Sequence, residues 1–105
     1  MVPFERMVPS NMDSKRADKL LRALANKKRI EIVMLLSDDK ARSVSEIAHD
    51  IKLSFKATSK HLARLVQAEY LDHNRVSLYM LYEINETMPK PQRSLLTFLL
   101  QTLHK

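Results

Sequence analysis

Apolar residues recur every three or four positions along most of the chain, which is the spacing of one buried helix face. This spacing predicts helices over residues 13–25, 27–37, 44–52, 55–69 and 91–104. Over residues 70–84 the spacing changes toward that of extended chain, and β-forming residues become frequent, which predicts two short antiparallel strands. Residues 1–12 contain Pro3 and Pro9 and show no period, so we expect a flexible N-terminal arm there.

Short polar residues stand where three of these helices begin. Asn26 and Ser54 each come just before a predicted helix, and both residue types accept hydrogen bonds from free backbone N–H groups. Residues 43–46 read Ser-Val-Ser-Glu, the spacing of a capping box. Two short helices joined by a tight turn and followed by a hairpin indicate a mainly α, winged helix-turn-helix domain over residues 13–105.

Two absences exclude much chemistry. None of the 105 residues is a glycine or a cysteine. Without glycine the chain has no P-loop, no dinucleotide fingerprint and no nucleophile elbow. Without cysteine it has no disulfide and no thiolate metal site. Because no serine–histidine or histidine–carboxylate pair has a supporting spacing either, we expect no enzyme, no metal site and no cofactor.

The charge balance points to a polyanionic partner. Lys and Arg number 18 against 12 Asp and Glu, a net charge of +6. Nucleic acid is the first candidate and an anionic membrane surface the second. The apolar run at residues 32–36 is far shorter than the roughly 20 residues of a membrane span. No signal peptide is evident at the N-terminus, so we expect a cytoplasmic protein.

Three stretches in order resemble the ArsR-type (ArsR/SmtB) transcriptional regulators. Residues 24–32 read Leu-Ala-Asn-Lys-Lys-Arg-Ile-Glu-Ile, and residues 43–48 read Ser-Val-Ser-Glu-Ile-Ala. The most specific stretch is residues 53–65, Leu-Ser-Phe-Lys-Ala-Thr-Ser-Lys-His-Leu-Ala-Arg-Leu, which is similar to the family's turn and recognition helix. The resemblance implies a DNA-binding regulator. The family's metal-binding cysteines are missing, so metal sensing is not carried over.

The family also implies a DNA-contacting surface on this helix and the following hairpin. A recognition helix places its first residues in the major groove, where short side chains allow close approach and Lys, Ser and His donate hydrogen bonds. The predicted DNA-binding residues are Ser54, Lys56, Ala57, Ser59, Lys60, His61, Arg64 and, at the hairpin, Arg75.

Plainer roles remain open for the same residues. Ser54 can serve only as a helix cap, and the lysines can form a solvated face. His61 can be a residue at the edge of the core that orients the helix. For Phe55 we favour packing on the preceding helix over contact with a thymine methyl group. Arg29 matches a family arginine that we interpret as mainly structural.

Lys27, Lys28 and Arg29 crowd the first turn of a helix, where positive charge opposes the helix dipole. This arrangement predicts a compensating partner for the cluster. The candidates are a DNA phosphate and an intramolecular carboxylate such as Asp50.

The last helix carries more large apolar residues than one face of a small monomer needs. The family pairs its first and last helices in a two-fold dimer, although this helix can instead cover its own core. The predicted dimer residues are Leu20, Leu24, Leu95, Phe98, Leu99, Thr102 and Leu103.

Family patterns also include a glycine after the recognition helix, where Tyr70 stands here, and another in the wing. The leading hypothesis is a homodimeric, sequence-specific regulator of double-stranded DNA, most simply a repressor. The alternative is a winged-helix module that binds a protein and no DNA, since a fold does not fix a function. The sequence does not reveal the inducing signal.

Overall fold

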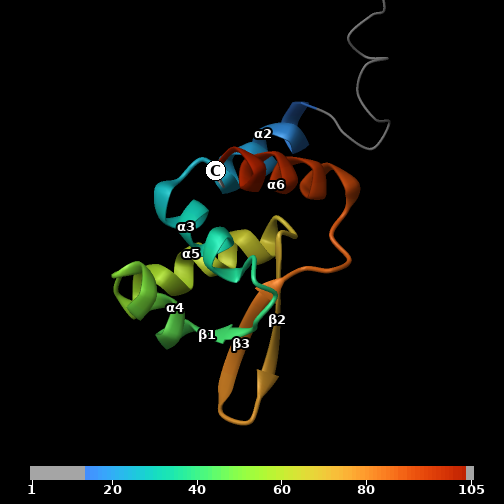
Figure 1. The fold of residues 1–105 in the computed structure, drawn as a ribbon. Coiled ribbons are helices and arrows are strands. Elements are labelled where there is room, and N and C mark those ends of the chain that lie inside the picture. Colours follow the sequence, from blue (N-terminus) through green and yellow to red (C-terminus); the bar gives the residue numbers. More distant parts are fainter. Residues whose placement is uncertain (1–13, 104–105) are drawn as a thin grey trace, which may run out of the picture.

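The computed structural model describes residues 14–103 and has the predicted winged-helix architecture (Figure 1). Residues 1–13, with the predicted arm, and the last two residues lie outside the described part. In chain order the elements are α2 (Ser14–Leu24), α3 (Lys27–Leu36), β1 (Arg42–Ser43), α4 (Val44–Ile51), α5 (Phe55–Gln67), β2 (Leu71–Val76), β3 (Tyr79–Ile84) and α6 (Lys90–Leu103).

Side-chain caps fix the starts of three helices. The Asn26 side chain accepts a hydrogen bond from the Arg29 N–H at 3.1 Å, so α3 begins at residue 27. Ser43 and Glu46 form the predicted capping box: each side chain accepts from the other residue's backbone N–H. Ser54 caps α5. These starts agree with the prediction because a cap is a local signal.

The chain makes its sharp turns without glycine. Four residues in the described part have left-handed φ values between 57° and 69°: Asp39, Lys52, Glu69 and Ser77. Glu69 ends the α5 segment, so α5 stops at Gln67, two residues before the predicted end. The residue in the left-handed conformation, which favours glycine, is Glu69, one position before Tyr70.

The sheet contains a strand that the hydrophobic pattern did not reveal. β1 pairs antiparallel with β3, which also pairs with β2, giving the order β1-β3-β2. Ser43 lies opposite Leu81 in this ladder. Ser43 is therefore both the last residue of β1 and the cap of α4, and the sheet is joined directly to the helix-turn-helix unit.

The core lies between α3, α4, α5 and the base of the hairpin. α3 contributes Ile32, Val33 and Leu36, each fully buried, as expected for the predicted central helix. Tyr70 is also fully buried, and its hydroxyl donates to the Leu20 carbonyl at 2.9 Å. Burial raises the pKa of Tyr70 to about 12, so this hydroxyl keeps its proton and its bond to α2.

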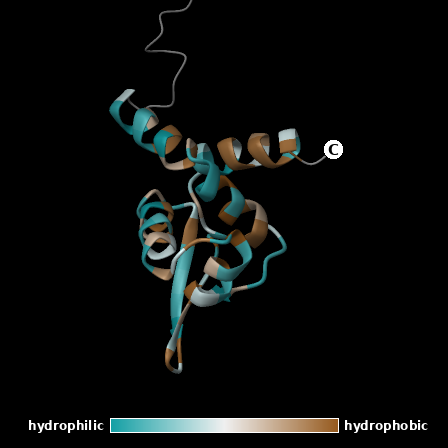
Figure 2. Ribbon diagram, turned by 90° about the vertical axis from the view of Figure 1, so that its left-hand side faces the viewer, coloured by the Kyte–Doolittle hydropathy of each residue, from teal (hydrophilic) through white to brown (hydrophobic). Residues whose placement is uncertain are grey.

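Two ends of the molecule have different characters. Helices α2 and α6 lie at one end, and the β2–β3 hairpin projects at the other (Figure 1). α6 is hydrophobic along most of its length, whereas α2 is largely hydrophilic (Figure 2).

Candidate nucleic-acid interface

The turn between α4 and α5 has a defined backbone geometry. Lys52 closes α4 in the left-handed conformation, with φ 57° and ψ 54°. The Leu53 N–H then donates to the Ala48 carbonyl at 3.0 Å, the longer bond of a Schellman motif. Ser54 follows as the cap of α5 and accepts from the Ala57 N–H at 3.1 Å. The turn is only three residues long, which sets the direction in which α5 leaves α4.

α5 has an anchored face and a free face. Thr58, Leu62 and Leu65 are each fully buried and hold the helix in the core. Lys56 and Lys60 are exposed on the opposite side, and Arg64 is exposed one turn further along. We call Lys56, Lys60 and Arg64 the basic face of α5.

The remaining predicted residues of this segment surround the start of the basic face. Ser54 is exposed while it caps the helix, and Ala57 and Ser59 are half-buried. Phe55 is 58% exposed, so the expectation that it packs on the preceding helix is wrong. A large apolar ring therefore lies at the solvent-facing start of α5, beside the lysines.

His61 differs from its neighbours because it is held by Arg29. The guanidinium of Arg29 lies 3.1 Å from His61 Nδ1. A guanidinium can only donate, so Nδ1 accepts and the ring proton is on Nε2. Arg29 Nε also donates to the Ala23 carbonyl at 2.7 Å. Arg29 thus links α2, α3 and α5, and His61 orients α5 with one ring nitrogen while the other retains a donor.

This arrangement disfavours a charged imidazole. The pKa of His61 is lowered from its ordinary value, first by burial and then by the positive charges of Arg29 and Arg64. A neutral His61 is also required for Nδ1 to accept from Arg29. The electrostatics and the hydrogen bond therefore favour the same protonation state.

The positive charge at the start of α3 has a partner inside the protein. Lys28 Nζ donates to the Ile51 carbonyl at the end of α4, and it lies 3.6 Å from a carboxylate oxygen of Glu31. Lys28 therefore has an intramolecular carboxylate beside it, as one of the two expectations held, but the residue is Glu31 and not Asp50. The ammonium group also satisfies one of the last carbonyls of α4 and lies favourably at the negative end of its dipole.

Arg75 is exposed on β2 of the hairpin, opposite Met80 on β3. The pairs Arg75–Met80 and His73–Tyr82 share one face of the two-stranded ladder, because partners in register lie on the same side. Arg75 is thus available to solvent on the strand that directly follows α5 in the chain.

The predicted dimer residues divide by burial. Leu20 and Leu24 are only 4% and 8% exposed, so they pack mainly within this chain, and Leu95 and Leu99 pack partly against the core. Phe98 is 69% exposed and Leu103 is 40% exposed. Leu21, which the apolar spacing assigns to the same helix face as Leu20 but which was not among the predicted dimer residues, is 53% exposed on α2. Thr102 is exposed, and its hydroxyl donates to the Phe98 carbonyl at 2.8 Å.

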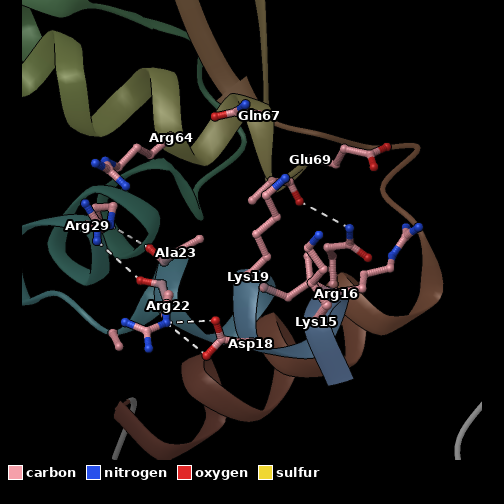
Figure 3. A pocket seen from close by; sticks show the side chains of 14 residues that line it. Lys15, Arg16, Asp18, Lys19, Arg22, Ala23, Arg29, Arg64, Gln67 and Glu69 are labelled. Atoms are coloured by element: carbon pink, nitrogen blue, oxygen red, sulfur yellow. Dashed lines mark hydrogen bonds and ion pairs between the residues drawn. The ribbon is translucent and has the colours of Figure 1, made fainter. Parts of the chain in front are cut away.

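A pocket of about 710 Å³ opens between α2 and the C-terminal half of α5 (Figure 3). Its lining includes the exposed pair of Arg22 and Asp18, 2.8 Å apart, and Gln92 of α6, whose amide nitrogen donates to the Ala68 carbonyl at 3.2 Å. Most charged side chains around it are basic: Lys15, Arg16, Lys19, Arg22, Arg29 and Arg64. Positive charge therefore extends past the start of α5 onto α2. Neither Gln92 nor the Tyr70 hydroxyl was predicted, since a buried polar group leaves no trace in an apolar period.

Within residues 14–103 no group of three or more His, Asp or Glu residues is placed to hold a metal ion. No helix in that part of the chain is long and apolar enough to cross a membrane.

Comparison with known proteins identifies a family that this chain matches. The family model for the bacterial regulatory proteins of the ArsR family matches residues 26–73, from the cap of α3 into β2. The chain is 30% identical over 100 residues to the transcriptional activator HlyU of Vibrio cholerae serotype O1. The match covers 90% of this chain and 92% of that protein.

Solved structures have the same architecture. HlyU from Vibrio cholerae N16961 has a TM-score of 0.75 at 25% identity, with 90% of this chain and 99% of that chain covered. The transcriptional repressor PagR of Bacillus anthracis has a TM-score of 0.64 at 28% identity, with 81% and 93% covered. The homodimeric winged helix-turn-helix domain of Mb0332 from Mycobacterium bovis shares the fold, with a TM-score of 0.70 at 21% identity and 90% and 89% covered.

The family match spans the helix-turn-helix unit, and the similarity to HlyU extends over nearly the whole chain. Both agree with the resemblance seen in residues 24–32, 43–48 and 53–65. The chain belongs to the ArsR family of bacterial regulatory proteins, and it is a DNA-binding transcriptional regulator with a winged helix-turn-helix domain rather than an enzyme.

Proposed function

We propose that two copies of this chain pair through α2 and α6, and that the dimer acts in the cytoplasm as a repressor with α5 of each copy in the major groove. The observation that carries the proposal is the basic face of α5. It lies on a helix whose other side is locked into the core by Leu62 and Leu65. A rigid helix with an exposed cationic side is what major-groove contact requires.

The start of α5 supplies the chemistry for contact with DNA. Its free N–H groups and the positive end of its dipole favour a phosphate. Lys56 and Lys60 add cationic donors, and Ser59 and Ala57 are short enough to let the backbone approach base edges. His61 contributes its Nε2 donor, since Nδ1 is occupied by Arg29. Arg64 and Arg75 are assigned to the phosphate backbone or the neighbouring minor groove.

The exposed apolar residues of α2 and α6 support the dimer. Leu21, Phe98 and Leu103 are 53%, 69% and 40% exposed. Burying a large apolar side chain is worth about 1.5–3 kcal/mol, and in a two-fold interface each residue counts twice. Leu95, Leu99 and Thr102 would border this contact, while Leu20 and Leu24 support α2 from beneath. A two-fold dimer presents its recognition helices to half-sites about one DNA turn apart.

The sign of regulation is assigned as repression because occupying an operator requires DNA binding alone. PagR, which shares this fold, is a repressor, whereas HlyU is an activator. The test therefore includes a measurement of whether the protein lowers or raises transcription from its operator.

Fluorescence anisotropy tests the proposal. The full chain is titrated into a duplex from its own upstream region and into a scrambled duplex, across a series of salt concentrations. We expect specific binding 10³-fold or more tighter than binding to the scrambled duplex at physiological salt, with a steep salt slope. Equal, weak binding to both duplexes contradicts the operator assignment. A transcriptional fusion then decides the sign, and a signal that rises with protein level overturns repression.

A further inference from the structure

The tip of the β2–β3 hairpin is apolar, which is unexpected for a wing beside a polyanion. Leu78 is 86% exposed, the most of any large hydrophobic residue in the described chain. Val76 and Tyr79, on either side of the turn, are 53% and 62% exposed. The tip shows as a hydrophobic end on a largely hydrophilic first strand (Figure 2).

The backbone holds this tip in a defined shape. Val76 pairs with Tyr79 at the last register position, so Ser77 and Leu78 form a two-residue turn. Ser77 has a positive φ of 58°, and Leu78 is not among the left-handed residues. A positive φ at the first central residue alone is typical of a type II′ turn, whose twist matches that of the two strands. A turn this tight leaves no loop that could fold Leu78 back onto the protein.

The surroundings of the tip suit DNA better than an apolar protein surface. Residues 73–82 include no aspartate or glutamate, and Arg75 and His73 are exposed within them. The hairpin also belongs to the sheet that carries the α4 cap, Ser43, so it is continuous with the DNA-binding unit. Apolar residues next to basic ones are the means by which minor-groove proteins unstack and kink a base step.

We propose that Leu78 is an apolar wedge that enters the minor groove beside the site contacted by α5 and opens one base step. Val76 and Tyr79 then line the walls of the groove, and Arg75 contacts a phosphate. This inference rests on the proposed function, because it needs α5 in the adjacent major groove. It adds specificity at a position without hydrogen-bonded base contact, since flexible TA and CA steps open more readily than others.

The test measures DNA shape separately from affinity. The full chain is added to its upstream duplex carrying a donor and an acceptor dye at the two ends, and bending is read from energy transfer. The duplex is also made with 2-aminopurine at successive flanking positions, which brightens on unstacking. The variants are Leu78→Ser, Leu78→Met, which keeps an apolar wedge, and Arg75→Ala. Circular dichroism checks folding, which we expect to be unchanged because Leu78 is almost fully exposed.

We expect the parent and Leu78→Met to bend the duplex by 20° or more and to brighten one flanking position. Leu78→Ser should lose both signals and bind roughly tenfold more weakly. Arg75→Ala should keep the bend while its salt slope falls by about two units, one for each protomer. Specific binding of the parent to a duplex that stays straight overturns the wedge but not the proposed function. A Leu78→Ser variant that bends and binds the duplex like the parent also overturns the wedge, and it would indicate that the hairpin tip contacts a protein instead. A parent that binds no duplex overturns the proposed function and the wedge with it.

Discussion

Arg29 donates to His61 Nδ1 across 3.1 Å and so joins the central helix α3 to α5, the helix that we propose contacts DNA. The two residues are 32 positions apart in sequence. The same guanidinium holds carbonyls of Arg22 and Ala23 at the end of α2, at 3.3 Å and 2.7 Å. The orientation of α5 therefore depends on an imidazole that must stay neutral to accept this bond.

Stability should fall in mild acid through His61. Its pKa is lower in the folded chain than the roughly 6.5 of an unfolded histidine, so the unfolded state takes up the proton first. The contribution of His61 to the free energy of unfolding is complete above about pH 6.5. It declines as the pH drops below that value and levels off under the folded pKa. Urea denaturation between pH 5 and pH 8 measures it.

The matched variants are His61→Asn and His49→Asn. The Asn oxygen can take the place of Nδ1 as acceptor for Arg29 but does not titrate, so His61→Asn should flatten the slope between pH 5 and pH 6.5. His49 is exposed on α4, and its replacement should leave the slope of the parent. Identical slopes in the parent and in His61→Asn would remove His61 as the cause.

Lys60→Ala should weaken operator binding without disturbing the fold, because Lys60 is exposed on the basic face of α5. Loss of a contact worth about 1–3 kcal/mol in each of two protomers predicts a complex at least about thirtyfold weaker, and two lost phosphate contacts lower the salt slope by about two units. Anisotropy across a salt series checks both quantities. Lys90→Ala, an exposed lysine at the start of α6, is the control that should bind normally. Equal affinity of the two variants argues against a role for Lys60.

The dimer should separate when charge is placed on α2 and α6. The double variant Leu21→Asp, Phe98→Asp puts four carboxylates into a two-fold interface, so sedimentation velocity should show monomers at micromolar concentration. Leu78→Asp is a control, since Leu78 is even more exposed than Leu21 and Phe98 but lies at the hairpin tip. It should remain dimeric. A double variant that still sediments as a dimer would place the interface elsewhere.

The same lysine-to-glycine change should have opposite effects at two sites. Lys52 has a left-handed backbone conformation, which costs a residue with a side chain about 1–2 kcal/mol. Glycine adopts this conformation without that cost, but its more flexible unfolded chain offsets about 0.5–1 kcal/mol of the stabilisation. Lys52→Gly should therefore raise the free energy of unfolding by up to about 1 kcal/mol. Lys60→Gly, inside α5, should lower it by about 1 kcal/mol. Thermal denaturation compares them, and a loss of stability in Lys52→Gly contradicts the account of this turn.

Elements with local signals were predictable, and those made by distant contacts were not. Asn26, Ser43 and Ser54 marked the starts of α3, α4 and α5, because a cap and its helix are neighbours in sequence. β1 escaped prediction because two residues show no period and become a strand only through pairing with β3. The end of α5 was placed too late because Glu69 gives no sign of its left-handed turn.

In the candidate site, too, features with a local sequence signal were predictable and features made by distant contacts were not. The basic face of α5 could be read from helical spacing, since a period assigns residues to faces. The helical spacing does not reveal that His61 is held by Arg29, or that Leu20 is buried while its neighbour Leu21 is exposed. Those facts depend on how α2, α3 and α5 meet. The exposed Leu78 was likewise hidden, because strand-like alternation does not reveal which residue stands at the turn.

Ser43 ends β1 opposite Leu81 and also caps α4, so one residue ties the hairpin to the helix that leads into α5. We therefore expect a constant distance and angle between the two proposed points of contact with DNA, on α5 and at the hairpin. One base pair inserted between those points shifts the second by about 3.4 Å and about 34° around the duplex axis. A hinged wing could follow such a shift, but a wing continuous with the cap of α4 cannot. We therefore expect the spacing of the two contacts along the duplex, as much as base identity, to decide which operators this chain recognises.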